Sequence, residues 1–229
     1  MATSQIILGI ARGPGNAASR SVSGGVDPEL RAKVFERDHH TCVFCGFKAQ
    51  KYQDIHFVDQ NPANTRMENM QTSCMYCAQC FDLEKTAAMK SGVLVWMPEI
   101  AQEDLAHIAR AIYVARISQG TMAECARGAL ETLMGRRTEA ISRVGTDDPF
   151  IMATVMRDFL GSRQYGARAQ KLNGLRLFPL DRRIVKEGDL EFNQFPQILA
   201  YWRSKDGPFG GRAPNMWRGI YNDALKKAA

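Results

Sequence analysis

The stretch from Cys42 to Cys80, CVFCGFKAQKYQDIHFVDQNPANTRMENMQTSCMYCAQC, decides the fold of this chain. It holds five of the six cysteines and one of the four histidines. Two Cys-x2-Cys pairs, separated by 28 residues, would bring four thiolates to one place. Four soft sulfur ligands are the donor set of a closed tetrahedral zinc site. The sequence therefore predicts one structural Zn²⁺ held by Cys42, Cys45, Cys74 and Cys77.

Two further cysteines need a separate interpretation. Cys80 lies three residues beyond Cys77, so these two could replace Cys74 and Cys77 as the second pair. We favour Cys74 and Cys77, because a knuckle just before a helix leaves Cys80 one turn into that helix, pointing elsewhere. Cys125 falls within a predicted helix in apolar surroundings, where a cysteine is usually a small core residue.

A site filled by four protein sulfurs leaves no open position for water or substrate, so the ion itself would not catalyse a reaction. Its expected role is to hold the fold, because binding of the metal contributes directly to the folding free energy of so small a module. Chelation of the metal, or Cys42→Ser, is therefore expected to unfold this region.

Composition predicts a soluble globular protein of one or two domains, since the 229 residues are 45% hydrophobic and 24% charged. The N-terminus lacks the pattern of a signal peptide, and no stretch approaches roughly 18 uninterrupted apolar residues. We therefore expect a cytoplasmic protein, in which clustered cysteines bind metal rather than form disulfides. The formal charge of +6 permits nucleic acid, anionic lipid or an acidic protein segment as partner.

The predicted fold class is α+β, with a small zinc-knuckle module embedded in a mostly helical domain. We divide the chain into four segments: an N-terminal strand and flexible connector (1–26), the zinc module (27–98), a helical part that packs on it (99–174) and an aromatic, basic C-terminal extension (175–229).

Local patterns predict most of the elements. Apolar β-branched runs predict strands, Asp-Pro pairs and a capping box predict helix starts, and an apolar stripe at helical spacing predicts a core-facing helix. We expect strands at 5–11, 54–58 and 93–97, and helices at 27–38, 78–89, 102–118, 121–145 with Ile141 on its apolar face, and 148–161.

The order RDHHTCVFCG, a hairpin, ENMQTSCMYC and a helix resembles the HNH-endonuclease module, a ββα-metal fold with an additional zinc-ribbon pair. In active members a histidine directly follows the second knuckle, whereas this chain has Ala78. His56 lies near the place of the catalytic strand histidine without the Asp-His pair of that motif, and Asn69 matches the family's asparagine. The resemblance implies a retained fold without nuclease chemistry, hence no enzyme.

A narrower resemblance covers residues 28–118. The segments FERDHHTCVFCGFKAQKYQDI, NMQTSCMYCAQCF and VLVWMPEI look like the DotN/IcmJ family of type IVB secretion and conjugation systems. This resemblance implies a cytoplasmic, zinc-containing, non-catalytic adaptor, peripheral at the inner membrane through its partners. It would bind the C-terminal extension of a DotL-like coupling ATPase and, with DotM-like and chaperone subunits, help assemble a platform that receives substrates.

Two other functions are compatible with the sequence. A metal-dependent HNH-type DNA endonuclease would use His56, with His39 and His40 as remnants of its site, although adjacent histidines before a knuckle commonly form a solvated turn. Non-catalytic nucleic-acid binding is favoured by residues 201–229, which carry six basic and two acidic side chains. The aromatic residues in that segment could stack on bases, namely Tyr201, Trp202, Phe209 and Trp217. Charge alone discriminates these functions weakly.

An adaptor that grips a long tail uses exposed apolar and aromatic side chains surrounded by charge. On that argument the candidate partner-binding residues are Trp96, Tyr113, Trp202 and Trp217. The helical spacing of the two C-terminal tryptophans with their apolar neighbours is equally compatible with a place in the core.

Overall fold

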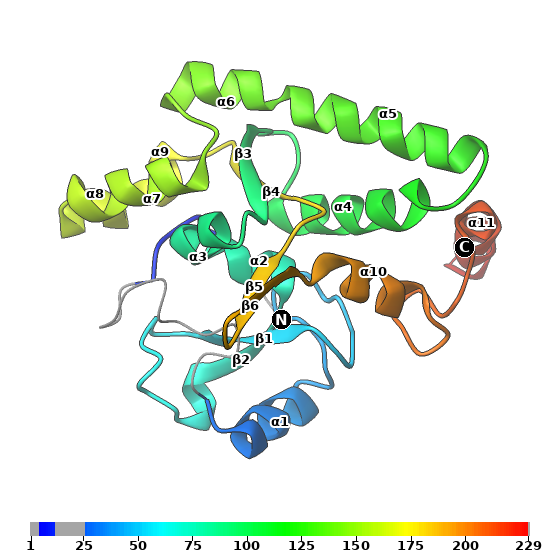
Figure 1. The fold of residues 1–229 in the computed structure, drawn as a ribbon, viewed down its shortest axis with the longest axis horizontal. Coiled ribbons are helices and arrows are strands. Elements are labelled where there is room, and N and C mark those ends of the chain that lie inside the picture. The colour runs from blue at the N-terminus through cyan, green and yellow to red at the C-terminus, as the bar shows by residue number, and fades with distance from the viewer. Residues whose placement is uncertain (1–4, 12–25, 229) are drawn as a thin grey trace.

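The computed structural model describes residues 5–11 and 26–228, where helices predominate and the strands occur in antiparallel pairs (Figure 1). The helices are α1 (Pro28–Arg37), α2 (Met75–Cys80), α3 (Leu83–Ala88), α4 (Gln102–Arg116), α5 (Thr121–Gly135), α6 (Arg137–Val144), α7 (Pro149–Asp158), α8 (Ser162–Gly166), α9 (Arg168–Lys171), α10 (Phe195–Arg203) and α11 (Trp217–Ala228). The strands are β1 (Gln53–Phe57), β2 (Met70–Cys74), β3 (Gly92–Trp96), β4 (Leu175–Pro179), β5 (Ile184–Glu187) and β6 (Leu190–Asn193). Short 3-10 turns, η2 (Met67–Asn69) and η3 (Pro214–Met216), precede β2 and α11. The α+β fold class predicted from the sequence is confirmed.

The cysteine-bearing module is a hairpin followed directly by a helix. Strands β1 and β2 pair antiparallel, from Gln53 opposite Cys74 to Phe57 opposite Met70, and α2 begins at the next residue. Helix α1 packs on this hairpin through Val34, which is fully buried against Met70. Asp27 caps α1 by accepting hydrogen bonds from the amides at the helix start, as the Asp-Pro sequence predicts. The resulting order is ββα.

The helical part lies against this module in a single main core (Figure 1). Strand β3, at the end of segment 27–98, pairs with β4, which belongs to the segment predicted as a C-terminal extension. Helix α4 packs between this sheet and α5, with Leu105 and Ala109 fully buried. The core therefore includes side chains from the module, from the helices and from the C-terminal segment.

The N-terminal apolar run is not the expected strand. Residues 5–11 are extended but irregular, and the amide of Gly9 donates to the carbonyl of Cys80 while the amide of Leu83 donates to Gly9. Ile6, Leu8 and Ile10 are buried. The run thus forms hydrogen bonds with the turn between α2 and α3, and no strand among the described residues pairs with it. The expected connector falls at 12–25, outside the described residues.

Three helix boundaries differ from the predictions. The helix expected at 78–89 is two helices, because the side chain of Asp82 accepts from the amide of Lys85 and starts α3 anew. The helix expected to run to Gly145 breaks at Arg136, and Gly120 rather than a Thr side chain lies at its start. Ile141, expected on the apolar face, is 47% exposed as a result. The helix from Pro149 ends at Asp158.

Cys125 is exposed on α5 rather than packed in the core, because α5 contacts α4 through a different face, which carries Ala123 and Ala126. None of the helices in the described part of the chain is both long and apolar enough to cross a membrane.

Candidate metal centre

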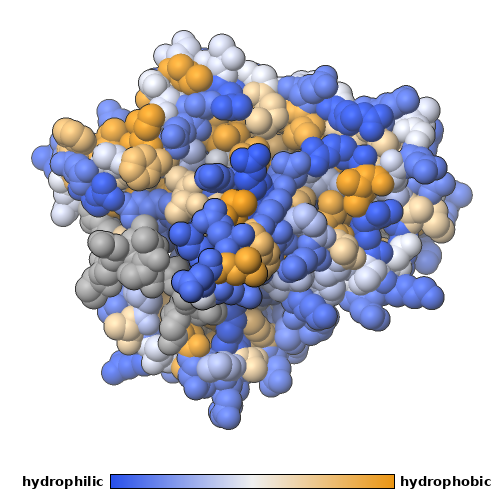
Figure 2. All heavy atoms as spheres, viewed as in Figure 1, coloured by the Kyte–Doolittle hydropathy of each residue, from blue (hydrophilic) through white to orange (hydrophobic). Residues whose placement is uncertain are grey.

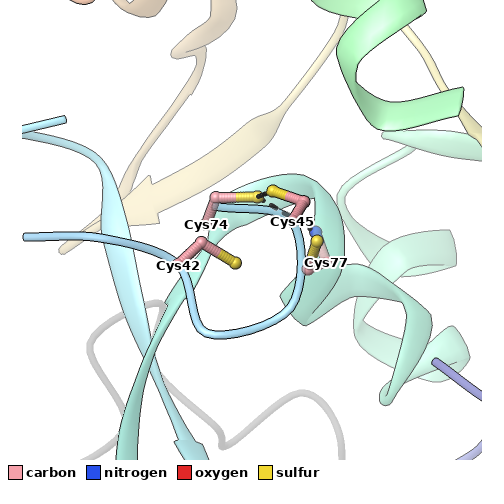
Figure 3. A group of neighbouring side chains, drawn as sticks. All are labelled: Cys42, Cys45, Cys74 and Cys77. Carbon is pink, nitrogen blue, oxygen red and sulfur yellow. Dashed lines mark hydrogen bonds between the residues drawn. The ribbon is translucent and has the colours of Figure 1, made fainter. Parts of the chain in front are cut away.

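Four cysteine side chains converge beside the ββα module (Figure 3). Cys42 and Cys45 lie on the turn after α1, Cys74 ends β2 and Cys77 lies in the first turn of α2. All four sulfur atoms lie within 4.8 Å of one another, so they could hold a single metal ion. The sulfurs of Cys45 and Cys74 are 3.7 Å apart, well beyond the length of a disulfide bond.

Backbone contacts fix the two knuckles against each other. Gly46 has φ of +71°, a left-handed conformation that suits glycine, and its amide donates to the carbonyl of Cys42. The amide of Val43 donates to the carbonyl of Thr72, which ties the first knuckle to β2. The amide of Cys77 donates to the sulfur of Cys74 at 3.4 Å. Amide donation of this kind favours a thiolate at that position.

Cys80 lies outside the cluster. Its thiol donates to the carbonyl of Tyr76, one turn back in α2, at 3.4 Å. The side chain is fully buried, and burial raises the pKa of Cys80 well above its usual range. The second pair of the cluster is therefore Cys74 and Cys77, and the alternative pair with Cys80 is not formed.

Arg110 of α4, which sequence reasoning missed, is the closest cation to the sulfurs. Its side chain is 1% exposed, and its Nη2 donates to the sulfur of Cys74 at 2.6 Å. The guanidinium lies over the ring of Phe47, 3.9 Å from the centroid, and 5.1 Å from that of Tyr76. Its Nε and Nη1 are buried with no hydrogen-bond partner among the described residues. The one strong polar contact of this buried charge is thus with the cysteine cluster.

His107, one turn earlier on α4, contacts the other knuckle. Its Nε2 donates to the carbonyl of Cys45 at 2.7 Å, and hydrogen bonding to Cys45 raises the pKa of His107. Arg110 and His107 could have been noticed only as polar residues beside the apolar stripe of a predicted helix. The sequence gives no indication that this face meets the cysteines.

The cluster combines cysteines whose pKa is lowered with cysteines whose pKa is raised. Hydrogen bonds from Cys42 and the other thiols lower the pKa of Cys45, whereas burial raises the pKa of Cys74. Burial is the largest influence and lowers the pKa of Arg110, but the charges of Cys74, Cys45 and the other nearby groups together more than offset it, and the pKa lies above its usual value. Four thiolates around a divalent ion would leave two negative charges, of which Arg110 offsets one. The residues present therefore fit a bound metal.

The residues expected near a remnant nuclease site are spread over separate contacts. His56 on β1 packs against Phe44 and Phe81, with centroid distances of 5.0 and 4.4 Å, and burial lowers its pKa to about 4. Asn69 supports the loop before β2, since its side chain accepts from the amide of Asp59 and donates to a carbonyl. The described residues offer one group of three or more potential metal ligands, the four cysteines.

His39 and His40 form a tight turn after α1, with φ of 53° and 52°. The side chain of His39 is exposed, whereas the Nδ1 atom of His40 is buried without a partner in the described part of the chain. The turn agrees with the interpretation given from the sequence, but only His39 is solvated as that interpretation expects.

Two of the four candidate partner-binding residues are core residues. Tyr113 and Trp202 are each 1% exposed, and Trp202 packs edge-on against Tyr76 and Phe195. Their helical periodicity reflects burial, so they cannot contact a partner while the fold is intact. Trp96 is half-buried beneath Arg143, and Trp217 is half-buried. The exposed parts of these two tryptophans remain available.

We expect one metal ion per chain, bound by all four clustered cysteines. Cys42→Ser and Cys77→Ser should each lose the ion and the cooperative thermal transition, because metal binding contributes about 10 kcal/mol or more to the folding of such modules. Cys80→Ser and Cys125→Ser should keep the ion, since neither sulfur belongs to the cluster. Metal analysis with circular dichroism tests this. An unchanged spectrum and melting temperature after complete metal removal would contradict it.

Arg110→Met should weaken metal binding by about 10–100-fold, the usual effect of losing a group that supports the ligands of a metal. The substitution keeps much of the side-chain volume over Phe47 but removes the positive charge next to Cys74. Competition with a chromogenic chelator measures the affinity. Arg116→Met, at the far end of α4, is the control, because Arg116 pairs with Asp181 instead. Equal affinities of the two variants would show that Arg110 does not support the site.

Comparison with known proteins identifies a relative of this chain. No family model matches the sequence. The Type 4 apparatus protein DotN of Legionella pneumophila is 31% identical over 159 residues, which cover 68% of this chain and 74% of the relative. Identity at this level over most of both chains indicates common descent and the same fold, and it agrees with the family resemblance of the cysteine-bearing segment. The chain belongs to the DotN family.

Proposed function

We propose that this protein is a component of a type IV secretion apparatus and acts there as a non-catalytic adaptor. It binds the C-terminal tail of a DotL-like coupling ATPase and, with DotM-like and chaperone subunits, helps assemble the platform that receives substrates. The observation that carries this proposal is kinship with a protein named for the type 4 apparatus. In this function the chain acts in the cytoplasm and reaches the inner membrane through its partners.

The metal in this proposal is zinc, with a structural role. Four buried or half-buried cysteine sulfurs form the donor set that zinc takes in closed sites. Such a site has no open coordination position, so the bound ion shapes the fold and leaves binding to the protein surface.

The proposal of a non-catalytic protein rests on two residues of the module. Ala78 occupies the place at which active HNH enzymes have a histidine ligand. His56 is packed against two phenylalanine rings that also contact each other, and among the described residues it has no carboxylate to orient it as a base. A hydrolase that uses a metal-activated water needs both an open metal position and a positioned base.

The exposed apolar face of α7 is the best candidate for the tail-binding surface. Ile151, Val155 and Phe159 recur at every fourth residue and are 49%, 40% and 74% exposed, and Phe150 beside them is 55% exposed. Apolar side chains gather over the region of α7 to α9 (Figure 2). Contiguous exposed apolar groups of this kind mark binding sites for apolar side chains of a partner. We therefore propose the exposed residues of α7 as partner-binding residues in place of the buried Tyr113 and Trp202.

The opposite face of α7 holds this surface rigidly. Helix α7 packs on α3, and Arg157 of α7 forms an ion pair with Glu84 of α3. Met152, Ala153 and Met156 are buried at this contact. A preorganised apolar face loses little conformational entropy when a flexible tail binds to it.

The double variant Val155→Ser, Phe159→Ser should bind the coupling-ATPase tail at least about tenfold more weakly, because large exposed apolar residues dominate such interfaces. Fluorescence anisotropy with a labelled tail peptide measures the affinity. Leu190→Ser is the matched control, since Leu190 is 64% exposed on the distant β5–β6 hairpin. If the unchanged protein forms no complex at micromolar concentration, the adaptor function is wrong. If the double variant binds normally, the surface lies elsewhere.

Incubation of the protein with plasmid DNA and Mg²⁺ or Mn²⁺ should leave the DNA uncut. The physical reason is the missing ligand at Ala78 and the packing of His56 among aromatic rings. Gel electrophoresis detects nicking and linearisation. Cleavage that disappears in His56→Ala would overturn the adaptor function in favour of an endonuclease.

A further inference from the structure

A cavity of about 390 Å³ lies between β1, the start of α2 and the β5–β6 hairpin, away from the tail-binding face of α7. Its volume is within the range of small-molecule sites. Tyr52, Met75 and Val185 contribute apolar wall, whereas Arg183 and Gln194 contribute polar groups and Lys186 lies on the hairpin strand beside them. Neither the metal centre nor the proposed adaptor function uses this cavity.

Arg183 is a buried cation in the wall of the cavity that has few polar partners. Its side chain lines the cavity but the residue is only 5% exposed. Its Nε donates to the side chain of Gln194 at 3.2 Å, and the rest of its guanidinium has no hydrogen-bond partner within the described residues. No carboxylate in that part of the chain lies within ion-pair distance of it. Burial lowers the pKa of Arg183, and the charge of Asp54 raises it by less.

The nearest negative charge is already shared. Asp54 lines the same cavity, but Arg31 and Lys85 each lie 3.7 Å from its carboxylate oxygens. Glu187 lines the cavity as well, so the lining holds three cations, Arg31, Arg183 and Lys186, and two carboxylates, Asp54 and Glu187. Positive charge at the wall of a concave, partly dehydrated site attracts anions more strongly than the same charge on an open surface.

The backbone at the cavity is also unusual. Tyr52 has φ of +61°, a left-handed conformation that side chains as large as tyrosine rarely adopt. Contacts with Tyr201, whose ring lies 5.7 Å away, accompany this conformation. Strained residues concentrate at sites that bind ligands, where the surrounding structure holds them in place.

We propose that this cavity binds a small molecule through an oxyanion, a carboxylate or a phosphate group, on the unused edge of the Arg183 guanidinium. The planar fork of an arginine matches both groups, because two parallel N–H donors reach two oxygen atoms. Met75 and Val185 contact the apolar part of the molecule, whereas the ammonium of Lys186 lies 3.5 Å from the carboxylate of Glu191, so most of the charge for the anion comes from Arg183.

Titration of the metal-loaded full chain with inorganic phosphate, at constant ionic strength, should raise the melting temperature in a saturable manner. Acetate and N-acetylglutamate in parallel titrations distinguish a planar from a tetrahedral oxyanion and test the contribution of an apolar body. Arg183→Gln should weaken binding of the best anion about tenfold or more, since charge-assisted bidentate contacts are lost. Arg183→Lys keeps the charge but loses the planar pair of N–H donors. Its affinity for the anion should therefore lie between those of the unchanged protein and Arg183→Gln.

Arg182→Gln is the matched control, because it removes the same charge from the neighbouring, exposed position. It should bind each anion as the unchanged protein does. If Arg183→Gln fails to fold, Arg183→Lys and Lys186→Gln carry the same test. The proposal is overturned if none of the three anions gives a saturable shift, or if Arg182→Gln weakens binding as much as Arg183→Gln, which would indicate general attraction to a basic protein.

Discussion

The contact between the guanidinium of Arg110 and the sulfur of Cys74 joins the two halves of the molecule. Arg110 belongs to α4 of the helical part, whereas Cys74 ends β2 of the ββα module. A buried cation without a counter-charge is strongly unfavourable, and so is a buried cluster of thiolates with excess negative charge. Each group makes the burial of the other possible. The relative position of module and helices is therefore fixed by charge as well as by apolar packing.

The cysteine cluster could be predicted because its geometry is local. Each Cys-x2-Cys pair closes within a single turn, so spacing alone brings its two sulfurs together, and the position of Cys80 in the following helix removes it from the site. Arg110 and His107 could not be predicted in this way. Their contacts with the cysteines depend on how α4 packs against the module, which no pattern of neighbouring residues in the sequence specifies.

The same distinction between local signals and long-range packing explains which elements of the fold were predicted correctly. Helix starts with an Asp-Pro pair and the long stripe of α4 were predictable, because both signals act within a few residues. The apolar run at 5–11 was not, since an extended buried segment and a strand have the same composition, and the available partner decides between them. Periodicity likewise showed that Tyr113 and Trp202 lie on apolar faces. It could not show that the protein's own core, rather than a partner, covers them.

A continuous path of packing leads from the metal centre to the exposed face of α7. Cys77 lies in α2, α2 turns directly into α3 at Asp82, and α3 packs on the inner face of α7. The carbonyl of Cys80 and the amide of Leu83 bind Gly9 along the same turn. Loss of the metal would free the start of α2 and with it the support of α7. If the proposed ion is bound, it would support the face of α7 proposed to bind the tail without touching it, because the short helices between them are packed in series.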